Sequence, residues 1–132
     1  MFDSNQCRIA IVEDDLDLQQ SMQECLHACG YKVWAAASAE EFYRRIQVEP
    51  VDLVILDIGL PGEDGLSVAQ QLREIANLAV IIISGRVALE DRLAGLRAGA
   101  TCYLTKPVNL DELLANIKAI VRRLKMSIDK RE

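Results

Sequence analysis

Short apolar runs alternate with amphipathic stretches along the chain, and this alternation constrains the fold more than any other feature. Several of the runs are continuously apolar, which is typical of strands covered on both faces. The predicted strands are 7–12, 32–37, 51–56, 79–83 and 102–105. Strands that alternate with helices indicate a parallel sheet with right-handed crossovers. We therefore predict an α/β fold of three layers, with a doubly wound five-stranded parallel sheet in the middle.

Capping residues and helical spacing define the predicted helices between these strands. Asp15 is expected to cap a helix over 15–29, and Ser38, three residues before Glu41, starts another that ends near residue 48. Asn109, three residues before Glu112, caps the last helix, which continues to residue 124. The apolar residues that mark the two remaining helices are Val68, Leu72 and Ile75, then Leu89, Leu93, Leu96 and Ala100.

Length and charge limit the function classes. A chain of 132 residues that is 51% apolar forms one folded domain, which we assign to residues 1–125. The charged segment 126–132 is expected to be a polar tail or the start of a linker to an output domain. A net charge of −5 argues against direct nucleic-acid binding, because phosphate contacts need a basic face. The chain has neither an apolar run long enough to span a bilayer nor a secretory signal, so we expect a cytoplasmic protein that binds no membrane.

Four cysteines are too few and too scattered for a disulfide scaffold. Cys25 and Cys29 flank His27 on a predicted helix, which leaves a metal site as one interpretation. We see no partner ligands elsewhere in the sequence. The favoured interpretation is that both cysteines are small buried hydrophobic residues and that His27 points away from them.

Polar residues stand at the carboxyl ends of four of the predicted strands. Glu13 and Asp14 follow the first, Asp57 the third, Ser84 the fourth and Lys106 the fifth. Parallel strands end at one edge of their sheet, where ligands bind. Clustered carboxylates repel one another unless a cation neutralises them, and oxygen ligands of this kind suit Mg²⁺. A lysine and a hydroxyl beside the metal could bind phosphoryl oxygens, and a carboxylate can itself accept a phosphoryl group.

Four motifs at the strand ends resemble a known family. "IVEDD", "LDIGLPGEDG", "IIISGR" and "YLTKPV" occur in the order and at the intervals of the receiver domain of bacterial two-component response regulators. The resemblance extends from about Arg8 to Leu124. It implies the flavodoxin-like (βα)5 receiver fold with strand order 2-1-3-4-5. It also implies a signalling switch rather than an enzyme, since such a domain catalyses only its own phosphorylation and dephosphorylation.

The resemblance assigns a role to each residue of the metal and acceptor site. Asp57 would accept a phosphoryl group from a sensor histidine kinase or a phosphotransfer protein. Mg²⁺ would be held by Glu13, Asp14 and Asp57 together with the backbone carbonyl of Gly59. Lys106 would pair with the phosphoryl oxygens.

The resemblance also implies a switch. Ser84 would hydrogen-bond the attached phosphoryl group, and Tyr103 would turn inward when this hydroxyl moves. The family usually has a cis peptide bond before the proline that follows its lysine, and Lys106-Pro107 fits this pattern.

Three alternatives were weighed against this interpretation. A phosphohydrolase with an aspartate nucleophile needs a second aspartate two residues later, where this chain has Gly59. A nucleotide-binding module needs a glycine-rich loop after the first strand, where this chain has the acidic "VEDDLD". A degenerate receiver that acts as a phosphorylation-independent interaction module is the remaining alternative.

The reading surface of such domains is formed by the fourth helix, fifth strand and fifth helix, through which transcription regulators often dimerise. Two positions depart from the salt-bridge pattern of those dimers. Cys102 stands where the family has an acidic residue, and Asn116 replaces a common arginine. The resemblance thus favours control of transcription, and it leaves open whether the chain forms a homodimer on phosphorylation.

Overall fold

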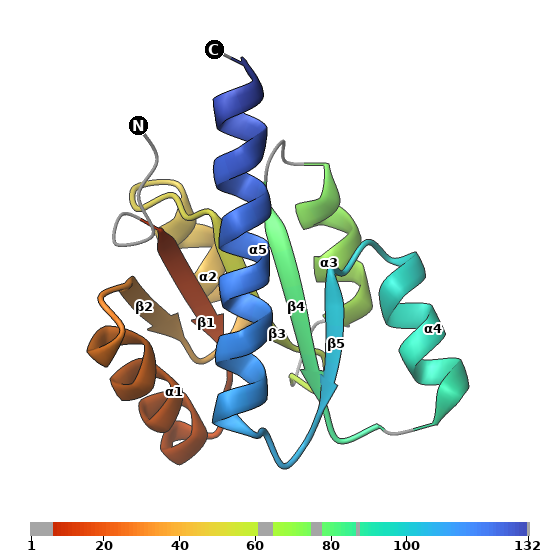
Figure 1. Ribbon diagram of the computed structural model, residues 1–132. Coiled ribbons are helices and arrows are strands. Elements are labelled where there is room, and N and C mark those ends of the chain that lie inside the picture. Colours follow the sequence, from red (N-terminus) through yellow and green to blue (C-terminus); the bar gives the residue numbers. More distant parts are fainter. Residues whose placement is uncertain (1–6, 61–64, 75–77, 87, 132) are drawn as a thin grey trace.

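The computed structural model describes residues 7–60, 65–74, 78–86 and 88–131, with side chains as far as Leu124. Five parallel strands form one sheet in the order β2-β1-β3-β4-β5 (Figure 1). The strands are β1 (Arg8–Val12), β2 (Lys32–Ala36), β3 (Leu53–Asp57), β4 (Ala79–Ser84) and β5 (Cys102–Thr105). This is the predicted α/β fold with the predicted strand order. The order of the strands reverses between β1 and β3, which is where ligands bind in open sheets of this kind.

Helices cover both faces of the sheet. On one face lie α1 (Leu16–Ala28) and α5 (Leu110–Arg131), and on the other lie α2 (Ala39–Ile46), α3 (Gly65–Arg73) and α4 (Leu89–Arg97). Figure 1 shows α5 crossing the sheet and continuing past the amino ends of the strands. The three predicted layers are therefore present.

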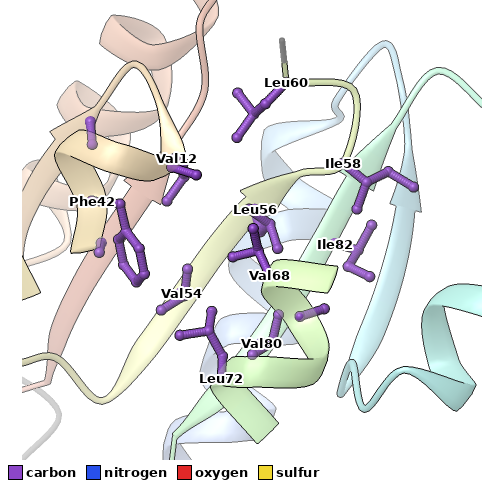
Figure 2. Packing of buried hydrophobic residues seen from close by; sticks show 14 of the residues in the cluster. Val12, Phe42, Val54, Leu56, Ile58, Leu60, Val68, Leu72, Val80 and Ile82 are labelled. Atoms are coloured by element: carbon purple, nitrogen blue, oxygen red, sulfur yellow. The ribbon is translucent and has the colours of Figure 1, made fainter. Parts of the chain in front are cut away.

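Alternate residues of each strand feed two separate cores. In β1, Ile9 and Ile11 face α1 and α5, whereas Ala10 and Val12 face α2 and α3. Figure 2 shows the second of these cores, in which Phe42 packs near strand residues such as Val54. All six of these side chains are fully buried. Because both faces of the strands are covered, their continuously apolar sequences are explained by burial on both sides.

The predicted helix caps are confirmed. The Asp15 carboxylate accepts hydrogen bonds from the amides two and three residues later, at 3.0 and 3.2 Å. Ser38 Oγ accepts from the Glu41 amide at 3.2 Å, and Asn109 Oδ1 accepts from the amide three residues later at 3.1 Å. The reciprocal bond of the capping box goes from the Ala37 amide to Glu41, one residue before the cap itself. Each cap gives a partner to backbone amides of the first turn that have none inside the helix.

The prediction that Cys25 and Cys29 are buried is wrong. Cys25 is partly exposed, and Cys29 and His27 are exposed. The reason is that α1 buries Met22 and Leu26, while Cys29 lies just beyond the helix, where the chain turns toward β2.

Some predictions concern the ends of elements or lie outside the described residues. Helix α5 continues to Arg131, so its backbone is helical through most of the segment expected to be a polar tail. Part of the "LPGEDG" motif, residues 61–64, and the helix marker Ile75 are not among the described residues. Within the described part of the chain, none of the helices combines the length and the apolar character needed to cross a membrane.

Candidate functional site

The candidate site lies at the carboxyl edge of the sheet. There the chain leaves the neighbouring strands β1 and β3 toward helices on opposite faces. Glu13 and Asp14 directly follow β1, Asp57 is the last residue of β3, and Lys106 directly follows β5. Ser84, the last residue of β4, is buried beside them at 2% exposure. Residues separated by more than 90 positions in the sequence thus meet at one edge because the strands are parallel.

Lys106 joins the two buried carboxylates of the site. Its Nζ lies 2.9 Å from Asp57 Oδ2 and 3.0 Å from Glu13 Oε1. Glu13 is fully buried and Asp57 is 4% exposed. Two carboxylates in such a buried place repel each other, and one ammonium group balances only part of their charge. The site therefore keeps negative charge that a further cation could neutralise.

The oxygen atoms of three acidic residues form a set that fits Mg²⁺. Glu13, Asp14 and Asp57 each offer an oxygen, and these oxygens lie within 4.8 Å of one another. Glu13 Oε1 is buried, and the described residues give it no hydrogen-bond partner of good geometry besides its ion pair with Lys106. Asp14 is exposed and leaves one side of the cluster open to solvent. A hard cation that binds one or two carboxylates and keeps several waters matches this half-open donor set.

The charges of the site shift the pKa values of its members. Burial and the adjacent Asp57 raise the pKa of Glu13 from 4.5 to about 7. Burial also opposes ionisation of Asp57, but hydrogen bonds from Glu13, Gly59 and Lys106 outweigh it and lower the pKa of Asp57. Burial opposes the charge of Lys106 as well, yet the two carboxylates raise the pKa of its ammonium group. Asp57 is therefore ionised at neutral pH and is the member of the pair that is prepared to act as a nucleophile.

Gly59 holds the other oxygen of the acceptor carboxylate. Its amide donates to Asp57 Oδ1 at 2.8 Å. A Cβ atom at position 59 would lie 3.3 Å from that oxygen, which is closer than ordinary van der Waals contact. The glycine therefore keeps the space beside the carboxylate open. The predicted role of its carbonyl as a metal ligand stays a prediction.

Ser84 and Tyr103 are linked through the backbone of one loop residue. The Arg86 amide donates to Ser84 Oγ at 3.0 Å, and the Arg86 carbonyl accepts from the Tyr103 hydroxyl at 3.0 Å. Tyr103 is buried at 7% exposure, so its ring is turned inward. Among the described residues, Ser84 makes no direct hydrogen bond to Asp57. The loop after β4 therefore connects the two predicted switch residues, a link that the sequence analysis missed.

Gly95 is a second residue that the sequence analysis missed. A Cβ atom placed there would lie 2.7 Å and 2.9 Å from two carbons of the Tyr103 ring. The ring can be buried under α4 because residue 95 has no side chain. A sequence signal did exist, since a glycine inside a helix is unfavourable unless close packing requires it.

The predicted reading surface carries a groove of about 310 Å³. Tyr103 and Cys102 line it together with Arg92, Glu112 and Asn116. Both residues that depart from the family's salt-bridge pattern, Cys102 and Asn116, thus lie in this groove. Burial raises the pKa of the Cys102 thiol to about 11, so this position carries no charge where an acidic residue would carry one.

Peptide geometry at the last strand agrees with the sequence analysis. The Lys106-Pro107 bond is cis, as predicted. The Lys106 amide also donates to the Ser84 carbonyl at 2.8 Å, which ties the end of β5 to the end of β4. The lysine is therefore positioned by the sheet itself.

Comparison with known proteins agrees with this geometry. A family model described as the response regulator receiver domain matches residues 9–118. The transcriptional regulatory protein PrrA of Mycobacterium tuberculosis is 40% identical over 117 residues, which are 88% of this chain and 50% of PrrA. The TorCAD operon transcriptional regulatory protein TorR of Escherichia coli O157:H7 is 39% identical over 119 residues, covering 90% of this chain and 52% of TorR. The chain thus spans about half the length of these curated relatives.

A solved structure shows the same fold. The CheY-like response regulator receiver domain protein from Methanospirillum hungatei superposes with a TM-score of 0.85 at 32% sequence identity. The alignment covers 92% of this chain and 98% of that protein. The likeness in fold therefore extends over most of this chain.

Proposed function

The chain belongs to the response regulator receiver family, and from this premise we propose that it is a phosphorylation-dependent switch in which Asp57 accepts the phosphoryl group. The observation that carries the proposal is the position of the Asp57 carboxylate. It is buried, ionised, held by Gly59 and Lys106, and adjacent to the acidic pair Glu13 and Asp14. This combination supplies a nucleophile, a charge that can stabilise phosphoryl oxygens, and a cation site.

The proposed reaction is a phosphoryl transfer from a phosphohistidine of a sensor kinase or a phosphotransfer protein. A carboxylate oxygen of Asp57 forms the new oxygen–phosphorus bond, the phosphorus–nitrogen bond of the donor breaks, and its electron pair stays on the imidazole. Lys106 would stabilise the negative charge on the phosphoryl oxygens, because its Nζ already lies 2.9 Å from the acceptor carboxylate. Glu13, Asp14, Asp57 and the Gly59 carbonyl would hold Mg²⁺. When bound, Mg²⁺ would neutralise phosphoryl oxygens and the acidic cluster.

We propose that the attached phosphoryl group is sensed through Ser84. Movement of the Ser84 hydroxyl toward the phosphoryl group would break its bond to the Arg86 amide. The Arg86 carbonyl also accepts from Tyr103, so the same loop movement would shift the ring at the centre of the reading surface. Phosphorylation would then change the relative populations of two arrangements of α4, β5 and α5.

The output proposed for this surface is control of transcription. The support is the similarity to PrrA and TorR, both described as transcriptional regulatory proteins. A domain that receives its phosphoryl group from ATP-dependent kinases would act in the cytoplasm, as the sequence analysis predicts. A homodimer formed on phosphorylation would have to use a groove in which Cys102 and Asn116 replace charged residues. Sedimentation with and without beryllofluoride, a phosphoryl mimic, tests whether this homodimer forms. A molecular mass that beryllofluoride leaves unchanged would exclude it.

The function is tested by intact-mass spectrometry after incubation with acetyl phosphate, with Mg²⁺ or with EDTA. We expect one phosphoryl adduct that requires Mg²⁺ and is absent from Asp57→Asn. Asp52→Asn is the matched control, because Asp52 pairs with Arg8 at the opposite end of β3. An unmodified wild-type protein would favour the alternative of a degenerate receiver that acts as a phosphorylation-independent interaction module.

A further inference from the structure

Two thiols at the end of α1 lie outside the site described above and are accessible to solvent. Cys25 is in the last full turn of the helix and is partly exposed, and Cys29 is the exposed residue that caps it. Both are free cysteines. The helix is anchored in the core by Met22 and Leu26, and the two cysteines lie at the edge of that buried face, where Cys25 is partly exposed and Cys29 exposed. Both positions can therefore be reached by a ligand from solvent.

The spacing of the two cysteines places their side chains on neighbouring positions of the helix surface. Residues four apart have Cβ atoms about 5–6 Å from each other. Cys29 keeps right-handed helical dihedrals, with φ −87° and ψ 0°, so the spacing holds at the cap. A disulfide needs Cβ atoms about 3.5–4.5 Å apart, so direct oxidation would require the last turn to distort. An ion between the two sulfur atoms spans the gap without that distortion.

The surroundings select an ion of low coordination number. Among the residues that the structure describes, the one group of three or more potential ligands is Glu13, Asp14 and Asp57, and its acidic pair stands before the opposite end of α1. His27 lies two residues from each cysteine, about 200° around the helix axis, and so cannot join them. Zinc in proteins takes four ligands, whereas thiolates also select the softer Cu(I). We propose that Cys25 and Cys29 form a two-thiolate site for a soft, low-coordinate metal ion of the Cu(I) type.

Binding at this site would release protons. Burial and the neighbouring Cys29 and Asp111 raise the pKa of the Cys25 thiol, so that thiol is protonated in the metal-free protein at neutral pH. Each thiol gives up its proton when its sulfur binds the ion, and the oxidation state of the metal does not change. Asp111, at the start of α5, is close enough to Cys25 to raise the pKa of its thiol, and its negative charge would favour a bound cation.

The test uses the reduced full chain without oxygen, in competition with the chromogenic Cu(I) chelator bicinchoninate. We expect the wild type to bind one equivalent of Cu(I), with X-ray absorption showing two sulfur neighbours and no nitrogen neighbour. Removing a residue that only supports a metal ligand typically lowers metal affinity about 10–100-fold. Cys25→Ser and Cys29→Ser remove a ligand itself, so each should lower the affinity for Cu(I) by at least about 100-fold. Cys102→Ser, at a half-buried thiol on β5, is the matched control and should bind as the wild type does.

A second measurement does not depend on the folding of any variant. Bound Cu(I) should protect Cys25 and Cys29 from alkylation in the wild type and leave the reactivity of Cys102 unchanged. The proposal is overturned if the wild type does not compete with the chelator, if both serine variants retain the ion, or if nitrogen ligands appear. It is also overturned if Cys102→Ser abolishes binding.

Discussion

Adding a methyl group at position 95 should push the switch tyrosine out of its buried position. In Gly95→Ala the new Cβ would lie 2.7 Å from Cδ2 of Tyr103 and 3.1 Å from Cδ1 of Ile82. Carbon atoms in contact prefer about 3.5–4.0 Å, so the ring must move or the helix must shift. Overpacking of this kind costs about 1–3 kcal/mol. Alanine is itself more stable than glycine in a helix by about 0.5–1 kcal/mol, which offsets part of that cost.

These magnitudes predict the sign of a double-mutant cycle. Gly95→Ala should lower the free energy of unfolding by about 1 kcal/mol in the wild type. In a Tyr103→Ala background the clash with the ring is absent, and the end of the Ile82 side chain, 3.1 Å from the new Cβ, can move into the vacated space. The same change should then raise stability by up to about 0.5–1 kcal/mol. The coupling energy between the two positions is then about 1–3 kcal/mol. Urea unfolding followed by the fluorescence of the single tryptophan, Trp34, measures all four proteins.

Tyr103→Phe is the control that separates the ring from its hydroxyl. The phenylalanine ring would fill the same space, so Gly95→Ala should destabilise this protein as it does the wild type. The hydrogen bond to the Arg86 carbonyl is lost in both members of that pair and cancels. If Gly95→Ala stabilises the wild type as much as it stabilises Tyr103→Ala, the ring does not occupy the space beside Gly95 and the reasoning is refuted.

Three further predictions concern the site and a cap. The raised pKa of Glu13 contributes stability to the metal-free protein that is fully present below about pH 4.5 and is lost as the pH rises through about 7. The free energy of unfolding should fall by at most about 3 kcal/mol over this range. Urea unfolding in EDTA should show the fall, and Glu13→Gln should abolish it. Gly59→Ala crowds Asp57 Oδ1 and should slow adduct formation with acetyl phosphate, whereas an unchanged rate would show that the space is not used. Ser38→Ala removes the cap of α2 and should cost about 1 kcal/mol, and a loss below about 0.3 kcal/mol would contradict the role of that bond.

The parallel sheet explains why so much of the site could be predicted from the sequence. Lys106 and Asp57 are 49 residues apart, yet each stands at the end of a continuously apolar run. Once the runs are assigned to one parallel sheet, their carboxyl ends must share an edge, and the contact follows without knowledge of any side-chain packing. The helix caps were predictable for a similar reason, because their hydrogen bonds reach only two or three residues along the chain.

Features that depend on how a helix docks could not be predicted in this way. Leu89, Leu93 and Leu96 fall at helical spacing, which correctly indicated α4, but all three are exposed. The side of α4 that faces the sheet carries Gly95 and Ala98, since the Tyr103 ring occupies the space that larger side chains would need. The spacing of apolar residues shows which side chains share one side of a helix. It does not show how that side is oriented toward the core.

The two thiols of α1 show the same limit at the end of a helix. Cys25 and Cys29 have the spacing of a buried face, and burial was the favoured interpretation. The helix ends at Ala28, and Gly30, with a φ of 91°, then turns the chain toward β2. Cys29, beyond the last turn, therefore no longer shares the environment of the face to which the pattern assigns it, and Cys25, inside that turn, lies at the edge of the face and is only partly buried.

The central claim is that Asp57 itself carries the phosphoryl group, and borohydride reduction tests this most directly. Borohydride converts an aspartyl phosphate into homoserine, whose mass identifies the modified position in a proteolytic peptide. After treatment with acetyl phosphate, we predict homoserine at position 57 when Mg²⁺ is present and intact aspartate when Mg²⁺ is removed. Homoserine at Asp14 or at another carboxylate, or none at all in a protein that binds Mg²⁺, would contradict the account.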